Sequence, residues 1–136
     1  LSLDLSSGLL LVDAGTVLSI TVLSPGGEFV GGQLIPGYRL QLLAMTKGTE
    51  ALPEMVFAAP GQEPFPKDTV AAMRRGVLQA MVSVVRDAQK ACGGMLWLCG
   101  GDAELLATEL RSSSPQLQLD PELQLRGLFD LMDASG

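Results

Sequence analysis

The sequence contains no histidine, and this absence excludes catalytic devices that depend on an imidazole. A serine or cysteine nucleophile activated by histidine, or a zinc ion held by histidines, cannot be built from this chain. Cysteine is nearly as scarce, and Cys92 and Cys99 lack the Cys-x-x-Cys spacing of a metal or redox pair. We expect both to be small buried thiols. Any chemistry must therefore come from carboxylates, hydroxyls, backbone donors and bound ions.

Positive charge and long apolar runs are also sparse. The formal net charge is −6, and the nine cationic side chains are scattered from Arg39 to Arg126. A nucleic-acid partner needs a clustered basic surface, so none is expected. No apolar run approaches the ~20 residues of a membrane-spanning helix, and no signal-peptide pattern is visible. We therefore expect a cytoplasmic protein without a membrane partner and, because Leu1 is not an initiator methionine, a fragment or processed piece.

The length of 136 residues and the hydrophobic content of 47% suit one modest core, so residues 1–136 are expected to form a single domain. Apolar periodicity, glycine and proline predict the order of elements. The expected strands are 9–13, 17–23, 28–35, 95–99 and a short extended piece at 117–119, and the expected helices are 37–48, 68–92, 102–110 and 121–132.

Three strands in an antiparallel meander, followed by alternating helices and strands, indicate an α/β fold with a mixed sheet. This order resembles that of the ribonuclease H-like half of the actin-like ATPase superfamily, in which two such halves flank a nucleotide cleft. Gly76 lies inside the longest expected helix, where glycine costs ~1 kcal/mol relative to alanine. We therefore expect a crossing helix packed against it.

The apolar run from Leu9 ends in Asp13-Ala14-Gly15-Thr16, before apolar residues resume. A carboxylate at the exit of a buried strand, with a glycine two residues later, lets the backbone approach an anionic or metal-bound ligand. The pattern is typical of a phosphate site. The alternative is a tight hairpin in which Asp13 only satisfies backbone donors.

Further motifs follow in a distinctive order. Gly31-Gly32 and Pro36-Gly37 interrupt and close the third strand, Lys67-Asp68-Thr69 starts the long helix, and Gly100-Gly101-Asp102-Ala103 follows a short strand. Together with the first motif, this set resembles the C-terminal half of type III pantothenate kinase, a family also called Bvg accessory factor. The resemblance covers the chain from about Leu9 onward.

The resemblance implies a kinase that uses ATP with Mg²⁺ to phosphorylate pantothenate to 4'-phosphopantothenate, the first step of coenzyme A biosynthesis. Asp13 matches the aspartate that binds a monovalent cation, K⁺ or NH₄⁺, beside the phosphates. Thr16 matches the hydroxyl that contacts ATP, and Gly15 keeps that approach open. Gly100 and Gly101 resemble the glycine pair against which adenosine lies, with a capped strand-to-helix turn as the alternative.

The resemblance also assigns a substrate contact and a partner. Thr69 matches a pantothenate-contacting threonine, although it could instead be a plain N-cap of the long helix. The segment from Gly31 to Gly37 resembles one near the family's dimer contact, so a homodimer is expected. Leu40, Leu43 and Met45 are read as core or dimer contacts rather than as a cofactor site.

Departures from the family pattern limit the prediction. Thr21 stands where the family commonly has a second aspartate, so Asp13 alone is a metal candidate. The Asp-x-Gly-Asn-Thr motif and the Gly-x-Asp-Arg motif, which carries the general base, do not occur in the chain. No catalytic residue is therefore assigned, and this piece alone is expected to be inactive. Alternatives are a non-catalytic accessory protein and, ranked last, a nuclease, because only Asp13 and Asp102 end strands.

Overall fold

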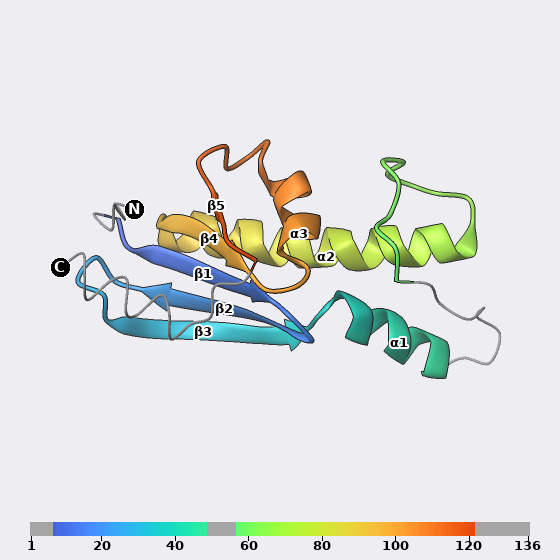
Figure 1. The fold of residues 1–136 in the computed structure, drawn as a ribbon, viewed down its shortest axis with the longest axis horizontal. Helices are drawn as coiled ribbons and strands as arrows, with labels where there is room; N and C mark the ends of the chain where they lie inside the picture. Colours follow the sequence, from blue (N-terminus) through green and yellow to red (C-terminus); the bar gives the residue numbers. More distant parts are fainter. Residues whose placement is uncertain (1–6, 49–56, 122–136) are drawn as a thin grey trace.

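The computed structural model describes residues 7–48 and 57–121, which form a mixed sheet packed against helices (Figure 1). Their elements follow the expected order. They are β1 (Leu9–Ala14), β2 (Val17–Leu23), β3 (Phe29–Pro36), α1 (Tyr38–Gly48), α2 (Thr69–Cys92), β4 (Met95–Cys99), α3 (Ala103–Leu110) and β5 (Gln118–Leu119). The α/β fold with a mixed sheet is confirmed.

The sheet has the strand order β3-β2-β1-β4-β5. Strands β1, β2 and β3 form the antiparallel meander, with only Gly15 and Thr16 between β1 and β2. Strand β4 pairs in parallel with β1, and β5 in parallel with β4. A parallel pair requires a long crossover connection, which α1 and α2 provide. The carboxyl ends of β1 and β4 consequently lie side by side, with Asp13 opposite Cys99.

Buried apolar side chains occupy both faces of the central strands. Leu10, Val12 and Ala14 face the helices together with Leu96 and Leu98. The alternate residues belong to a second buried cluster on the opposite face, which contains Leu9, Leu11, Leu23, Trp97 and Cys99. Because β1 is buried on both faces, it reads as a continuous apolar run rather than as an alternating one. Asp13, which ends that run, is the residue of β1 that carries a charged side chain and is only partly buried.

The edge strand β3 contrasts with this interior. Phe29, Val30 and Leu34 are exposed on it, with Leu34 exposed by 74%. Gly32 lies so close to β2 that an added Cβ would be 2.5 Å from the carbonyl oxygen of Ile20. The large apolar side chains of β3 are therefore available for contact with another surface.

Helix α2 covers the helix-facing side of the sheet with one apolar stripe that includes Met73, Val77 and Met81. The side chain of Asp68 caps its start, accepting a hydrogen bond of 2.9 Å from the Ala71 backbone N–H. Gly93, with a φ of 67°, ends the helix in the left-handed conformation that glycine adopts readily. These caps fix where the long crossover begins and ends.

Arg75 is a buried cation on α2 that the sequence reading did not single out. Its guanidinium lies 3.0 Å from the carboxylate of Glu109 on α3 and donates to the backbone carbonyl of Gly61. A buried charge needs such partners because burial alone would destabilise it. Arg75 thus ties α3 and the proline-containing segment to the crossover helix.

Two expectations about packing were wrong. Cys92 is exposed, because it occupies the last position of α2 beyond the apolar stripe, whereas Cys99 is buried as expected. Among the described residues, nothing lies within 4 Å of an added Cβ on Gly76, so no crossing helix of that part of the chain packs there. Leu40, Leu43 and Met45 are exposed on α1, which excludes the core interpretation, and the dimer contact stays a prediction.

The expected helix at 121–132 lies outside the described residues. Within residues 7–48 and 57–121, no helix combines the length and the apolar character that crossing a membrane would require.

Candidate functional site

Two turns meet where the parallel strands β1 and β4 end. The first is Gly15-Thr16, between β1 and β2, and the second is Gly100-Gly101-Asp102, between β4 and α3. The backbone N–H of Asp102 donates a hydrogen bond of 2.9 Å to the carbonyl oxygen of Ala14. In open α/β sheets, ligands bind outside the carboxyl ends of the strands, so this is the place to look for a site.

Gly100, in the second turn, is packed tightly against the end of β1. Its φ is 94°, and an added Cβ would lie 2.5 Å from Asp13 Oδ1 and 2.8 Å from the Ala14 backbone nitrogen. A side chain at this position would therefore displace the Asp13 carboxylate or the β1 backbone. The glycine is required both by its conformation and by the space.

The start of α1 is fixed to the same place. The backbone N–H of Gly37 donates a hydrogen bond of 2.8 Å to the carbonyl oxygen of Thr16. An added Cβ on Gly37 would overlap the carbonyl oxygen of Gly15. Three glycines from distant parts of the chain thus bring β1, β4 and α1 together with little space between their backbones.

A cavity of about 450 Å³ opens beside these turns. One part of its wall is polar and consists of backbone and side chains from both turns, whereas the other part is apolar and comes from α1 and Phe57. The lining residues are Ala14, Gly15, Thr16, Arg39, Leu40, Leu43, Phe57, Gly101 and Asp102. The volume and the mixed lining suit a small organic ligand that has both a polar and an apolar part.

Burial raises the pKa of the Asp102 carboxyl above its usual value, and the positive charge of Arg39 opposes this shift. The Arg39 guanidinium also lies 5.7 Å from the centre of the Phe57 ring, within the range of a cation–π interaction. Tyr38, beside Arg39, donates a hydrogen bond of 2.7 Å from its hydroxyl to the carbonyl oxygen of Ala58. Two neighbouring residues of α1 therefore hold the Phe57 wall of the cavity in place.

The thiol of Cys99 lies next to Asp13 at the end of β4. Burial and the negative charges of Asp13 and Asp120 raise the pKa of Cys99 to about 12. The thiol is therefore protonated at neutral pH. A protonated, buried thiol is a poor nucleophile and a poor metal ligand, so Cys99 has a packing role.

The structure brings most of the predicted site residues together. Gly15, Thr16 and Gly101 line the cavity, while Asp13 and Gly100 lie against each other immediately beside it. Asp13 itself is not a lining residue, because it faces the opposite side of the sheet from Ala14.

Thr69 does not join this group. It is exposed at the first position of α2 and does not line the cavity. The plain N-cap alternative for Thr69 is wrong as well, because the side chain of Asp68 caps the helix.

Sequence reasoning missed the α1 wall and Phe57. Arg39 was counted among scattered cations, and Leu40 and Leu43 were read as core or dimer contacts. A signal was present, since Arg39 directly follows Pro36-Gly37-Tyr38, the segment that fixes α1 to the first turn. Phe57 carries no sequence signal, because its place depends on the contact of its ring with Arg39 and on the hydrogen bond from Tyr38 to its neighbour Ala58, both across a long connection.

Among residues 7–48 and 57–121, no three side chains of the metal-binding types His, Cys, Asp and Glu converge on a metal site. Asp13 offers one carboxylate beside a turn rich in backbone groups. A single carboxylate fits a monovalent cation, or a Mg²⁺ ion held mainly by phosphates and water, better than a divalent ion enclosed by protein ligands.

The sheet order, the crossover and the paired turns define an α/β domain in which an antiparallel meander continues into parallel strands. A solved structure from Campylobacter jejuni, described as a conserved Baf family transcriptional activator, shares this fold with a TM-score of 0.69. The two sequences are 22% identical, and the matched region covers 94% of this chain and 58% of the Campylobacter jejuni chain. The sequence pattern of the family described as type III pantothenate kinase matches residues 3–91. This chain belongs to the type III pantothenate kinase family.

Curated relatives agree with this family. A type III pantothenate kinase from Rhodopirellula baltica is 37% identical over 130 residues, which are 91% of this chain and 47% of that protein. One from a Synechococcus strain is 37% identical over 128 residues, covering 88% of this chain and 50% of that protein. The chain spans about half the length of the curated relatives that it matches.

Proposed function

We propose that this chain supplies the C-terminal half of an ATP-dependent kinase that converts pantothenate to 4'-phosphopantothenate, the first step of coenzyme A biosynthesis. Family membership supports the kinase class. The observation that carries the proposal is the meeting of two turns, with Gly100 packed directly against the Asp13 carboxylate at the edge of a cavity. Such a pair of turns is suited to hold the phosphates and the nucleoside of one ligand.

The roles proposed for the turn residues follow from their place in the cavity wall or, for Gly100, immediately beside it. Thr16 is exposed and offers its hydroxyl to the phosphates, and Gly15 beside it leaves the backbone accessible. Gly100 and Gly101 lie just before the start of α3, where the positive end of the helix dipole favours a polar or anionic group. Without side chains, they let adenosine lie against the backbone.

Asp13 would hold the monovalent cation, K⁺ or NH₄⁺, and Mg²⁺ would arrive with ATP. A bound cation supplies positive charge that offsets the repulsion between phosphate oxygens and carboxylates. Phosphoryl transfer is driven largely by positioning and by neutralisation of such charge. The contribution of this chain is therefore to orient ATP, while the general base would come from a Gly-x-Asp-Arg motif that this chain does not contain.

Thr69 is proposed to contact pantothenate, which its exposure at the start of α2 permits. A homodimer is proposed through the β3 edge, where Phe29, Val30 and Leu34 are exposed and Gly31, whose added Cβ would meet no described atom within 4 Å, allows a close approach. A cytoplasmic location fits a metabolic kinase of this kind.

A non-catalytic accessory protein is the alternative function. The missing Gly-x-Asp-Arg motif favours it, as does the fold shared with a protein described as a transcriptional activator. In either case, the 136-residue chain by itself is expected to form no phosphopantothenate, because it lacks the Gly-x-Asp-Arg motif whose carboxylate would accept the proton of the pantothenate hydroxyl.

Asp13→Asn in a full-length protein that contains both halves tests the proposal. The amide keeps the size of the side chain but removes the charge that would hold the cation. We expect kcat/KM for pantothenate phosphorylation to fall by about 100-fold or more and K⁺ dependence to disappear. The midpoint of thermal unfolding should change by less than about 2 °C. Phosphopantothenate formation and thermal unfolding are measured on the same preparations.

Asp87→Asn is the matched control, because Asp87 is exposed on α2 away from the cavity and should tolerate the same change. An Asp13→Asn variant that keeps its activity would reduce Asp13 to a turn residue. A wild-type protein with both halves and no activity would favour the accessory function.

A further inference from the structure

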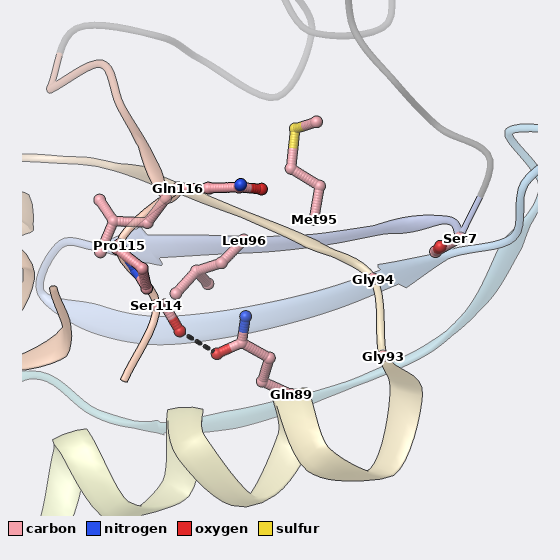
Figure 2. Close-up of a pocket in the computed structure, with 10 residues that line it drawn as sticks. Ser7, Gln89, Gly93, Gly94, Met95, Leu96, Ser114, Pro115 and Gln116 are labelled. Carbon is pink, nitrogen blue, oxygen red and sulfur yellow. Dashed lines mark hydrogen bonds between the residues drawn. The ribbon is translucent and has the colours of Figure 1, made fainter. Parts of the chain in front are cut away.

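A second cavity, of about 330 Å³, lies at the opposite end of β1 and β4, where β4 begins (Figure 2). It is bounded by the last turn of α2, by the Gly93-Gly94 connection and by the segment between α3 and β5. Its lining residues are Ser7, Gln89, Gly93, Gly94, Met95, Leu96, Ser114, Pro115, Gln116 and Leu117. None of the residues proposed to bind ATP or pantothenate is among them.

One polar group in this cavity is held in a fixed orientation. Ser114, only 6% exposed, donates a hydrogen bond from its hydroxyl to Oε1 of Gln89. The amide nitrogen of Gln89 therefore points away from Ser114 and toward Leu96, into the open space of the cavity (Figure 2). Within the described residues, this nitrogen makes no hydrogen bond. An oriented donor without an internal partner is suited to a ligand that brings an acceptor.

The edge of β4 is also open at this point. The β4–β5 ladder pairs Trp97 with Gln118 and Leu98 with Leu119. Met95 and Leu96 have no strand partner on that side in the part of the chain that the structure describes. The segment from Pro115 to Leu117 bounds the cavity without pairing with them. Peptide groups at a strand edge are natural partners for another amide.

The lining of the cavity favours a neutral ligand over an anion. None of the lining side chains is ionisable, and Lys90 in the last turn of α2 is not among them. The carboxyl end of α2 lies in the wall, and the carbonyls of a helix end carry partial negative charge. A carboxylate or phosphate would therefore find no positively charged side chain in the lining. A neutral group with both a donor and an acceptor matches the wall, to which Gln116 adds a second carboxamide (Figure 2).

We propose that this cavity binds a small neutral molecule through an amide group, whose carbonyl oxygen accepts a hydrogen bond from Nε2 of Gln89. The volume is that of roughly ten water molecules at ~30 Å³ each, which sets the size of the ligand. The site is separate from the nucleotide cavity at the other end of the strands and does not depend on the proposed kinase activity.

Butyramide, butyrate and butylammonium are three probes of similar size and different charge. Each is titrated into the full-length ¹⁵N-labelled protein while the Gln89 side-chain NH₂ signal and the Gly93 and Gly94 amide signals are followed by NMR. We expect butyramide to shift these signals saturably, with a Kd on the order of 1–10 mM, as suits so small a probe. Butyrate should bind at least tenfold more weakly, and butylammonium should also bind more weakly than butyramide.

Gln89→Leu should weaken butyramide binding at least tenfold, because it removes the donor and keeps the apolar stem. Gln79→Leu, at an exposed position of the same helix, is the matched control and should leave binding unchanged. Gln116→Leu is the second test variant, for the case that Gln89→Leu disturbs the fold. It changes an exposed position and should also weaken butyramide binding. Absence of saturable shifts up to 50 mM butyramide (about five times the weakest expected Kd), equal binding of butyrate, or unchanged binding to both cavity variants would overturn the proposal.

Discussion

The two ends of the parallel β1–β4 pair show how one pair of strands can build sites of opposite character. At the carboxyl ends, two turns meet around a carboxylate, and the cavity wall contains Arg39 and Asp102. At the amino ends, the lining has no ionisable side chain. The difference follows from what is joined to β4. Helix α3 begins after the carboxyl end of β4 and presents backbone N–H groups there. Helix α2 ends before the amino end of β4 and presents backbone carbonyls.

Gly100 follows β4 and Gly94 precedes it, and the space available for a side chain differs between the two positions. An added Cβ on Gly100 would lie 2.5 Å from Asp13 Oδ1, in a backbone conformation that only glycine adopts easily. On Gly94 it would lie 3.0 Å from the carbonyl carbon of Gly8, without a positive φ. The carboxyl end is therefore the more constrained of the two.

Gly100→Ala should produce the largest effect on stability. The new methyl group has no space, and the φ of 94° strains any side chain. We expect unfolding free energy to fall by about 2–4 kcal/mol, together with most of the kinase activity of a full-length protein. Urea unfolding followed by circular dichroism measures the first quantity.

Gly101→Ala is the control at the next residue, because no described residue has an atom within 4 Å of its added Cβ. Its stability should stay within about 0.5 kcal/mol of the wild type. Equal losses for the two variants would mean that the contact with Asp13 does not constrain this end.

Gly94→Ala should have an intermediate effect at the amino end. The backbone of Gly8 and Leu9 must give way by a few tenths of an ångström, because the nearest atoms lie at 3.0–3.2 Å. A loss of about 1 kcal/mol is expected in the same urea experiment, with the kinase activity of a full-length protein preserved. A loss as large as that of Gly100→Ala would remove the contrast between the two ends.

Asp102→Asn should have the smallest effect, and one of opposite sign. Since burial raises the carboxyl pKa in the folded state, folding favours the protonated form, and the ionised form lowers stability as pH rises above the ordinary value of 3.8. At pH 7 the amide should stabilise the protein by less than ~1 kcal/mol, because solvent screens a half-buried group. The gain should vanish at pH 3. A gain that is independent of pH would show that charge burial is not its cause.

The sequence predicted the fold well because local signals and global packing agree. Gly15 marked the tight turn between β1 and β2, Asp68 the start of α2, and Gly93-Gly94 its end. Each of these residues acts through its own backbone conformation or through a hydrogen bond within a few residues. Such effects are visible in a sequence.

The site was only partly predictable, for a physical reason. The glycines that let β1 and β4 approach were visible, but the Arg39–Phe57 contact depends on how a long connection returns to α1. Gly76 was misread because a helix-interior glycine usually indicates a packing contact, which is absent here. The burial of Arg75 could not be foreseen either, because it depends on Glu109 from a later helix.

The crossover through α2 also has a kinetic consequence. The meander of β1, β2 and β3 joins neighbours in the chain, whereas the pairing of β4 with β1 joins segments separated by β2, β3, α1 and the 24 residues of α2. Pairing between segments distant in sequence slows folding, because the connecting chain must first lose its freedom. Both cavities lie at the ends of this parallel pair, so we expect both to form only when β4 pairs with β1. A chain that ends before residue 95 lacks wall residues of both cavities.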